Sequence, residues 1–214
     1  TGFMHLGVLY VSLISERIAH GSDGVFFLRI EDTDRKREVK GAREFIIDSL
    51  ANFGVHTDEG VGRHETENGK YGPYTQSQRK EIYQSYIKKM LARGDAYPCF
   101  MTSDELEAMT KHQNKLRARP GYHGSWAEWR DRPEADVLAA LDRGMPFVIR
   151  YRSTGDIKKR RIIQDAARGK LEMPENDNDI VIMKHDGLPT YHLAHVIDDY
   201  LMHTTIVVRG DEWI

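Results

Sequence analysis

The spacing of apolar residues predicts alternating helices and strands in the first quarter of the chain. Apolar side chains recur close to the 3.6-residue helical period at Val8, Val11, Ile14 and Ile18. This pattern predicts a helix over residues 8–20, which the turn residues GSDG at 21–24 end. The apolar run VFFLRIE at 25–31 predicts a buried strand of a parallel sheet. A second helix is predicted over 38–54, so the order favours α/β winding.

The middle of the chain carries signals for helix ends. Ser77 is a candidate N-cap for a helix over 78–93, and Gly94 follows its last residue. Thr102 or Ser103 is a candidate cap for the next helix, because acidic residues follow in its first turn.

The last third of the chain mixes both patterns. A short helix is predicted over 134–144 and an alternating strand over 146–153. Residues 179–193 predict a strand, an Asp-Gly turn and a second extended piece. A helix over 194–202 and a buried strand that begins at residue 204 and runs into a loop at Arg209 complete the pattern.

Composition narrows the class of protein. The chain has 214 residues, 40% of them hydrophobic and 30% charged, which is typical of one large or two small globular domains. Apolar runs stay shorter than the roughly 18 residues of a membrane span, so no membrane association is expected. Cys99 is the single cysteine, which excludes an internal disulfide and favours a reducing, cytoplasmic location. The net charge of −2 does not by itself indicate a nucleic-acid binder.

Local charge is more informative between residues 150 and 170. The basic residues there are Arg150, Arg152, Lys158, Lys159, Arg160, Arg161, Arg168 and Lys170, against Asp156 and Asp165. Such a run is either a solvated face or a strip that contacts phosphates. Both interpretations stay open from the residues alone.

Two short stretches carry candidate chemistry in the first half. His5-Leu6-Gly7 stands at the start of the first predicted helix, where free backbone N–H groups and the helix dipole favour an anion. A polar loop is the alternative. Glu31, with its acidic neighbours, lies where the predicted strand ends, and ligands of open α/β sheets bind at that edge. A solvated turn is the alternative there.

The stretch 187–213 gathers further polar residues. Arg209, expected at a strand end, could bind a carboxylate with two N–H groups. His192 and His195 lie near two aspartates and could suggest a metal site. We disfavour that reading, because Asp198 and Asp199 are adjacent and should point apart.

Four blocks resemble a known family. The blocks TGFMHLG, LRIEDTDR, GPYTQSQR and LPTYHLAHVIDDYLMHTTIVVRGDEW occur in the order found in bacterial-type glutamyl-tRNA synthetases, which are class I aminoacyl-tRNA synthetases. The residues His5-Leu6-Gly7-Val8 resemble the start of the class signature, usually written HIGH. Glutaminyl enzymes and eukaryotic glutamyl enzymes usually have FDDTNP where this chain has IEDTDR. The resemblance covers nearly the whole chain.

The resemblance implies a fold and a division of the chain. We expect an α/β protein with a Rossmann-type parallel sheet and an inserted α+β acceptor-binding (connective peptide) domain. Residues 1–94 would form the first Rossmann half, without its first strand. Residues 95–178 would form the inserted domain that binds the tRNA acceptor end, and residues 179–214 would return to the sheet.

The resemblance also implies ligands and residue roles. ATP contacts are expected from Thr1, Gly2, His5, Gly7 and Glu212, with His5 and Gly7 as the catalytic residues. Glu31 would hold the ammonium group of glutamate, and Tyr191 and Arg209 would line its pocket. Contacts to tRNA are expected from Lys158, Lys159, Arg160 and Arg161. The family often has Asn where this chain has His195, so the resemblance leaves the role of His195 open.

The implied reaction joins L-glutamate to tRNA(Glu) through a glutamyl-adenylate, with ATP and Mg²⁺. Charging of tRNA(Gln) stays an open alternative, and a monomer is expected. Some relatives hold zinc through several cysteines, but this chain has Cys99 alone and Trp126 where a ligand cysteine would be expected, so no structural zinc is expected.

The family usually has an Arg and a Ser ahead of TG, and later a lysine-rich KMSKS loop and an anticodon-binding domain. We therefore expect a catalytic-domain excerpt that does not charge tRNA by itself. The competing interpretations are a paralogue that glutamylates queuosine in tRNA, a non-catalytic tRNA-binding paralogue, and a nucleotidyltransferase that shares the His-x-Gly helix.

Overall fold

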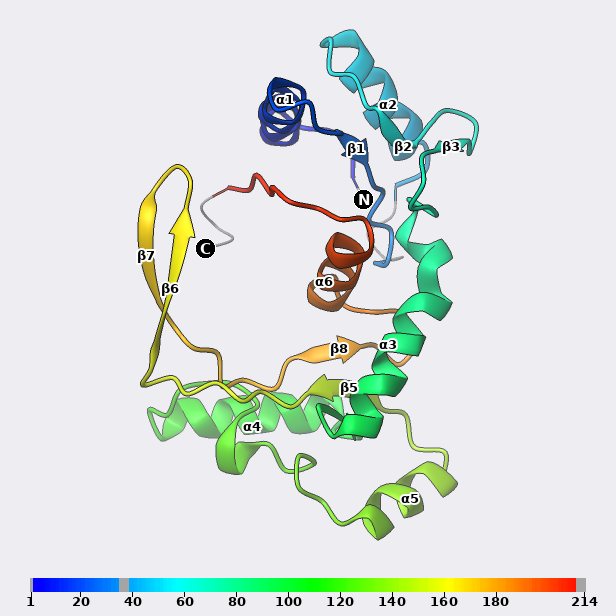
Figure 1. Ribbon diagram of the computed structural model, residues 1–214. Helices are drawn as coiled ribbons and strands as arrows, with labels where there is room; N and C mark the ends of the chain where they lie inside the picture. The colour runs from blue at the N-terminus through cyan, green and yellow to red at the C-terminus, as the bar shows by residue number, and fades with distance from the viewer. Residues whose placement is uncertain (1, 35–38, 211–214) are drawn as a thin grey trace. The chain divides into compact units, whose positions relative to one another are not determined.

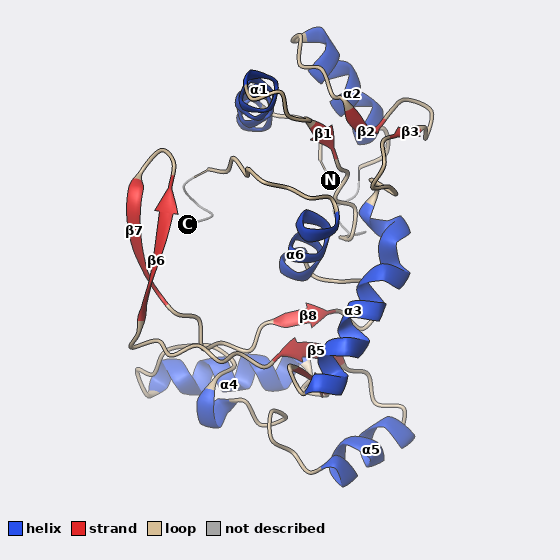
Figure 2. Ribbon diagram, in the orientation of Figure 1, coloured by secondary structure: helices blue, strands red, loops and turns tan. Residues whose placement is uncertain are grey.

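The computed structural model describes residues 2–34 and 39–210, which have a mixed α/β fold (Figures 1 and 2). The chain divides into two compact units. The first unit comprises residues 1–83 and 191–214, and the second comprises residues 84–190. None of the helices in the described part of the chain has the length and hydropathy of a membrane span.

The first unit contains short strands and helices around a small sheet. Its elements are α1 (Leu6–Gly21), β1 (Phe27–Leu28), α2 (Ala42–Asn52), β2 (Glu59–Val61), β3 (Glu67–Asn68), the 3₁₀ helix η2 (Gln76–Arg79), the first turn of α3 (Lys80–Arg93) and α6 (Tyr191–Leu201). β1 pairs with β2 in parallel, and β3 pairs with β2 antiparallel. A Cβ atom at Gly60 would lie 2.2 Å from the carbonyl oxygen of Leu28, so the parallel pair requires glycine there.

The second unit contains a three-stranded sheet and a separate hairpin. Its elements are β4 (Ala96–Cys99), α4 (Ser103–Lys115), the 3₁₀ helix η3 (Gly124–Trp126), α5 (Glu134–Asp142), β5 (Val148–Tyr151), β6 (Arg160–Asp165), β7 (Gly169–Pro174) and β8 (Val181–Met183), preceded by the rest of α3. β5 lies between β4 and β8, and both pairings are antiparallel. β6 and β7 pair only with each other among the described strands.

The helices predicted from apolar spacing are confirmed as α1, α2, α3 and α5, with ends that differ by a few residues. The predicted cap at Thr102 is confirmed as a capping box. The backbone N–H of Glu105 donates to Thr102 Oγ1 (3.2 Å), and the Glu105 carboxylate accepts from the N–H of Thr102 (2.7 Å). Two orphan donors of the helix are thereby satisfied by residues only three positions apart.

Ser77 is not the helix cap that its position suggested. Its hydroxyl donates to Asp32 Oδ2 (2.5 Å), and its backbone N–H donates to Asp32 Oδ1 (2.7 Å). Asp32 lies 45 residues away in sequence and therefore supplies the carboxylate at the start of η2. Because Asp32 is so distant in sequence, no residue near Ser77 indicates that its hydroxyl and N–H are already bound.

The strands near the two ends of the chain differ from the prediction. β1 covers only Phe27–Leu28 of the predicted 25–31, followed by an isolated bridge at Ile30. The buried strand predicted from residue 204 to the loop at Arg209 is wrong, because the described residues offer it no paired neighbour, and Ile206 and Val207 are more than half exposed.

Two further predictions concern α6 and β8. α6 begins at Tyr191, three residues before the predicted helix, so the second extended piece is reduced to a bridge between Met183 and Pro189. β8 pairs with β5 and so belongs to the second compact unit. The compact units divide the chain by its internal contacts, which do not test where an inserted domain begins and ends. The expected boundaries of that domain, at residues 95 and 178, remain a prediction.

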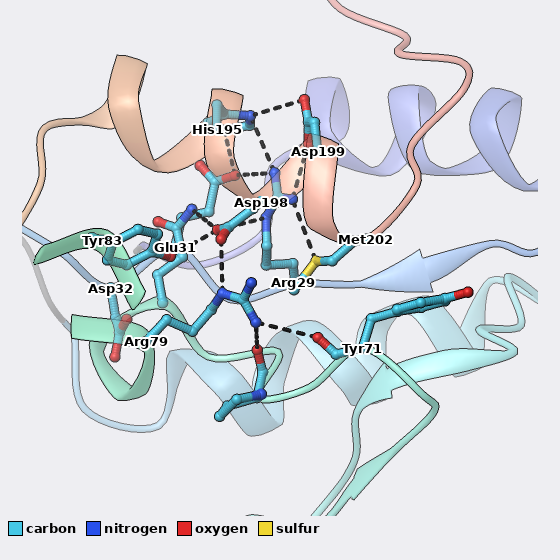
Figure 3. Close-up of polar contacts among 12 residues, drawn as sticks. Arg29, Glu31, Asp32, Tyr71, Arg79, Tyr83, His195, Asp198, Asp199 and Met202 are labelled. Atoms are coloured by element: carbon cyan, nitrogen blue, oxygen red, sulfur yellow. Dashed lines mark hydrogen bonds and ion pairs between the residues drawn. The ribbon is translucent and has the colours of Figure 1, made fainter. Parts of the chain in front are cut away.

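A buried ion pair fixes α6 within the first unit (Figure 3). The side chains of Asp198 and Arg79 are 0% and 1% exposed, and Asp198 Oδ1 accepts from Arg79 Nε at 2.7 Å. Asp198 Oδ2 accepts from Gln76 Nε2 (3.0 Å) and from the hydroxyl of Tyr83 (2.8 Å). Burial and the charge of Asp198 raise the pKa of Tyr83, so its hydroxyl remains a donor. Both carboxylate oxygens are therefore satisfied away from water.

We predict that Asp198→Ala strongly destabilises the protein, because the guanidinium of Arg79 would stay buried without its counter-charge. The expected loss in the free energy of unfolding is about 3–5 kcal/mol, measured by urea denaturation. Asp48→Ala is the control, because Asp48 pairs with Arg63 at the surface with both side chains about half exposed. It should cost less than about 1 kcal/mol. Equal losses in the two variants would contradict the importance of the buried pair.

Candidate active site

Acidic, basic and histidine side chains from four segments of the first unit meet along one cavity of about 540 Å³. These side chains are Arg29 and Glu31 after β1, Glu59 on β2, His195 and Asp199 on α6, and His203 and Arg209 beyond α6. Side chains of α1 and residues around β1 supply an apolar part of the wall. Figure 3 shows the cluster of Arg29, Glu31, His195 and Asp199.

His195 lies at the centre of this cluster. Its Nε2 atom lies 2.5 Å from Glu31 Oε1. On the other side of the ring, Nδ1 lies 3.1 Å from Arg29 Nη2 and 3.2 Å from Arg209 Nη2. The ring of Tyr191 packs against the imidazole with centroids 4.1 Å apart. The histidine therefore contacts every residue that the sequence had assigned to glutamate binding.

Arg29 is the cation that organises the floor of the cavity. Its side chain is 8% exposed, and Nη1 donates to Asp199 Oδ1 at 3.0 Å. Nη2 lies 3.5 Å from Glu31 Oε1, and Nε lies 3.8 Å from Asp198 Oδ2. One guanidinium thus faces three carboxylates, which limits the rotamers open to it and to them.

The two adjacent aspartates of α6 bind partners in different parts of the first unit. Asp198 points into the interior toward Arg79, whereas Asp199 points to Arg29 and the cavity. The expectation that they point apart is confirmed. Among the described residues, no group of three His, Cys, Asp or Glu side chains is arranged to hold a metal ion. The expectation of no structural zinc concerns the whole chain and remains a prediction.

The pKa values of the cluster follow from its mixed charges. Partial burial opposes ionisation of Glu31, but the hydrogen bond and charge of His195 and the charge of Arg29 outweigh it, so the pKa of Glu31 is lowered. The pKa of Asp199 is lowered in the same way, against its burial, by His195 and Arg29. Burial favours a neutral His195, yet its carboxylate neighbours raise the pKa of the imidazole.

The structure brings together the three residues expected to bind the glutamate substrate, Glu31, Tyr191 and Arg209. Glu31 and Arg209 line the cavity, and both charges act on the hydroxyl of Tyr191, whose pKa is raised mainly by burial. Two cationic guanidinium groups and a carboxylate on one wall suit a ligand with carboxylates and an ammonium group. Arg29 and Arg79 were missed, although a charged residue inside the apolar run 25–31 was a usable signal for Arg29.

The residues expected to bind ATP lie at the other end of α1. His5 is the residue before the first turn of α1 and makes no side-chain capping bond. A Cβ atom at Gly7 would lie 3.1 Å from the imidazole of His5, and open space surrounds the position of a Cβ at Gly2. His5 and Gly7 are exposed and are absent from the described lining of the cavity, whose α1 residues begin at Val11. Thr1 and Glu212 lie outside the described residues.

The basic run of the second unit has two parts. Arg150 is buried, donates to the carbonyl oxygen of Asp179 (2.7 Å) and lies 3.9 Å over the ring of Tyr122. Arg152 pairs with Asp131 at 2.6 Å. Arg150 is therefore structural, and a phosphate-contacting strip that includes it is wrong. Arg152 is partly exposed and is engaged by Asp131. The candidate tRNA contacts are exposed at the start of the β6–β7 hairpin, namely Lys158, Lys159, Arg160 and Arg161.

Comparison with known proteins defines the class. The family model described as "tRNA synthetases class I (E and Q), catalytic domain" matches residues 1–214. The chain belongs to this family.

Two similar relatives are both named glutamate–tRNA ligase. The chain is 50% identical to a glutamate–tRNA ligase of Clostridium perfringens over 214 residues and 49% identical to one of Sorangium cellulosum over 226 aligned positions. All of the chain is covered in both cases, but only 39% and 40% of those relatives, so it spans about two fifths of their length. A crystal structure of a glutamate tRNA ligase from Elizabethkingia meningosepticum in complex with its amino acid matches all of this chain and 42% of its own, with a TM-score of 0.89 and 36% identity.

We predict that Glu31→Gln changes the acid limb of the stability curve. Because the pKa of Glu31 is lowered from 4.5 in the folded protein, its ionised form stabilises the fold above that value. The stability is lost as the pH falls through the lowered pKa. The difference in the free energy of unfolding between wild type and Glu31→Gln should thus be largest above about pH 5 and shrink below about pH 4.

Urea denaturation across this pH range measures the effect. Glu134→Gln, at the exposed start of α5, gives the background for the same substitution. A difference between wild type and Glu31→Gln that widens in acid would contradict the assigned ion pairs.

Proposed function

We propose that this chain is the catalytic part of an enzyme that joins L-glutamate to tRNA(Glu) at the expense of ATP, through a glutamyl-adenylate. The observation that carries the proposal is the convergence of Glu31 and Arg209 on one cavity with mixed charge, where Tyr191 packs against the His195 that both of them contact. Relatives at 50% and 49% identity are named glutamate–tRNA ligase, which supports the same reaction.

Charge separates glutamate from glutamine in this site. The two amino acids have nearly the same shape, so a pocket must read the side-chain carboxylate by its charge. Arg209 is 35% exposed and faces the cavity, where a guanidinium can give two N–H bonds to a carboxylate but gains less from a neutral amide. Glu31 takes the ammonium end, and Tyr191 orients the ligand between them. The alternative role of Arg209 is to pair with Asp211 or Glu212 near the end of the chain, and both of these residues lie outside the described residues.

ATP with Mg²⁺ is the proposed second substrate. The start of α1 offers free backbone N–H groups and the positive end of the helix dipole, which suit phosphates. Gly2 and Gly7 let the nucleotide approach the backbone, and His5 donates to a phosphate oxygen as charge develops in the transition state. Thr1 and Glu212 are proposed to contribute further contacts.

The chain is proposed to combine a Rossmann-type sheet with an inserted acceptor-binding domain at 95–178. Its exposed basic hairpin would contact the phosphates of the tRNA acceptor end. The protein would act as a cytoplasmic monomer without structural zinc, and charging of tRNA(Gln) is a second possibility for the same chemistry. The names of the relatives favour tRNA(Glu) over a queuosine-modifying or non-catalytic paralogue.

We predict that Arg209→Ala raises the glutamate KM in the enzyme expressed at its full natural length. The loss in kcat/KM for glutamate should correspond to several kcal/mol, on the scale of breaking a buried charge pair. The KM for ATP should change little, because the guanidinium reads the amino acid.

Charging of tRNA(Glu) with labelled glutamate measures these constants. Absence of glutamate charging by the wild type would remove the proposed function itself. Arg143→Ala is the control, because this exposed arginine follows α5, and its Nε donates to the backbone carbonyl of Ala139 within the same helical turn. An unchanged glutamate KM in folded Arg209→Ala enzyme would exclude the proposed role of Arg209.

We predict that Lys158→Ala/Lys159→Ala weakens tRNA binding and its salt dependence. Each lost phosphate contact should reduce the slope of log K against log salt concentration by roughly one unit. Lys88→Ala/Lys115→Ala is the matched control, because it removes two exposed lysines from α3 and α4. Filter binding across a salt series measures both. Equal slopes for the two double variants would argue against a specific hairpin contact.

A further inference from the structure

The carboxylate proposed to take the substrate ammonium group is already engaged within the protein. His195 Nε2 lies 2.5 Å from Glu31 Oε1, and Arg29 Nη2 lies 3.5 Å from the same oxygen. A substrate ammonium group would need a place on this carboxylate as well. Binding of an amino acid therefore has to rearrange the contact between His195 and Glu31.

The groups that face His195 come from three segments and carry opposite charges. Arg29 and Glu31 reach it from the residues after β1, and Tyr191 and Asp199 reach it from its own helix. Arg209 reaches it from the segment beyond α6. With two guanidinium groups against two carboxylates, the proton on the imidazole decides whether the cluster has a net charge of zero or one.

The geometry of the ring allows both protonation states. Two guanidinium nitrogens at 3.1 and 3.2 Å from Nδ1 favour a lone pair on that atom, as in a neutral imidazole. Glu31 at Nε2 and Asp199 Oδ2 at 3.8 Å from Nδ1 favour the imidazolium. The two carboxylates outweigh the effect of burial, because the pKa of His195 is raised although burial alone would lower it. Loss of either carboxylate would tip the ring toward its neutral form.

We propose that His195 is a further positioning residue of the amino-acid site. Before the amino acid binds, the His195 ring occupies the position on Glu31 that the substrate ammonium group will take. When the amino acid binds, the ring leaves Glu31 as a neutral imidazole. The proposal rests on the proposed function, since it takes Glu31 as the ammonium site. One positive charge arrives with the ammonium group, and one proton leaves His195 for solvent. The charge around Glu31 is thereby conserved, and Nδ1, which has no lone pair in the imidazolium, gains one that can accept from Arg29.

The proton released links amino-acid affinity to pH. Without amino acid, Glu31 and Asp199 hold the imidazole pKa above its usual value. With Glu31 taken by the ammonium group, the pKa of His195 falls. Between the two pKa values the affinity for glutamate should rise as pH rises, by at most about tenfold per pH unit.

Isothermal titration calorimetry with L-glutamate tests this in the full-length protein. Wild type should bind glutamate several-fold more tightly at about pH 8 than at about pH 6, and buffers of different ionisation enthalpy should reveal release of up to about one proton. His195→Asn should bind with less than about twofold change over the same range and release no proton. His192→Asn, the same substitution at an exposed position of α6, should behave like wild type. A purely structural role of His195 would lower affinity equally at every pH.

A second measurement does not depend on the variant. The NMR titration of the His195 ring, assigned by its absence in His195→Asn or by through-bond experiments in wild type, should show a lower pKa with saturating glutamate than without it. An unchanged or higher pKa in the presence of bound glutamate would overturn the proposal while leaving the proposed function intact. Failure of wild type to bind glutamate at all would instead remove the proposed function.

Discussion

A carboxylate that is completely removed from water holds the first unit in its arrangement. Asp198 is surrounded by donors from η2 and α3, more than 110 residues earlier in the chain. A buried charge is tolerated only when its hydrogen-bonding capacity is filled, so η2, α3 and α6 have to meet in one geometry. Apolar packing alone would tolerate small shifts between these elements. The ion pair with Arg79 tolerates far less.

The orientation of α6 then decides where its charged and titratable side chains near the cavity lie. With Asp198 directed inward, the next residue and the one a turn earlier are directed to the cavity, as Asp199 and His195 are. These side chains do not need a ligand to hold them, since Arg29 and Glu31 already do. Such preorganisation reduces the ordering cost of binding, because the rotamers are fixed before the ligand arrives. The same internal pairing also means that a ligand competes with existing contacts.

Local features of the fold could be predicted from the sequence, and long-range ones could not. Periodic apolar residues located α1, and the capping box at Thr102 uses groups only three residues apart. Asp32 and Ser77 are 45 residues apart, so nothing beside Ser77 indicated that its hydroxyl was already used. Arg150 was read as part of a charged surface because a single sequence does not show that Tyr122 covers it. The candidate site residues come from motifs. Arg29 was missed because it holds other side chains of the cavity in place and belongs to no role that those motifs assign.

Arg29 touches both the carboxylate that holds the fold and those that line the cavity. Evolutionary change at this position is therefore constrained twice, and the two constraints cannot be relaxed separately. Substitutions at Asp198 and Asp199 should also be epistatic with Arg29, since each alters the field that the others experience. In a selection experiment, inactive variants at Arg29 would mix two causes, poor accumulation of protein and poor recognition of substrate. Only the cellular amount of each variant, compared with its activity, would separate them.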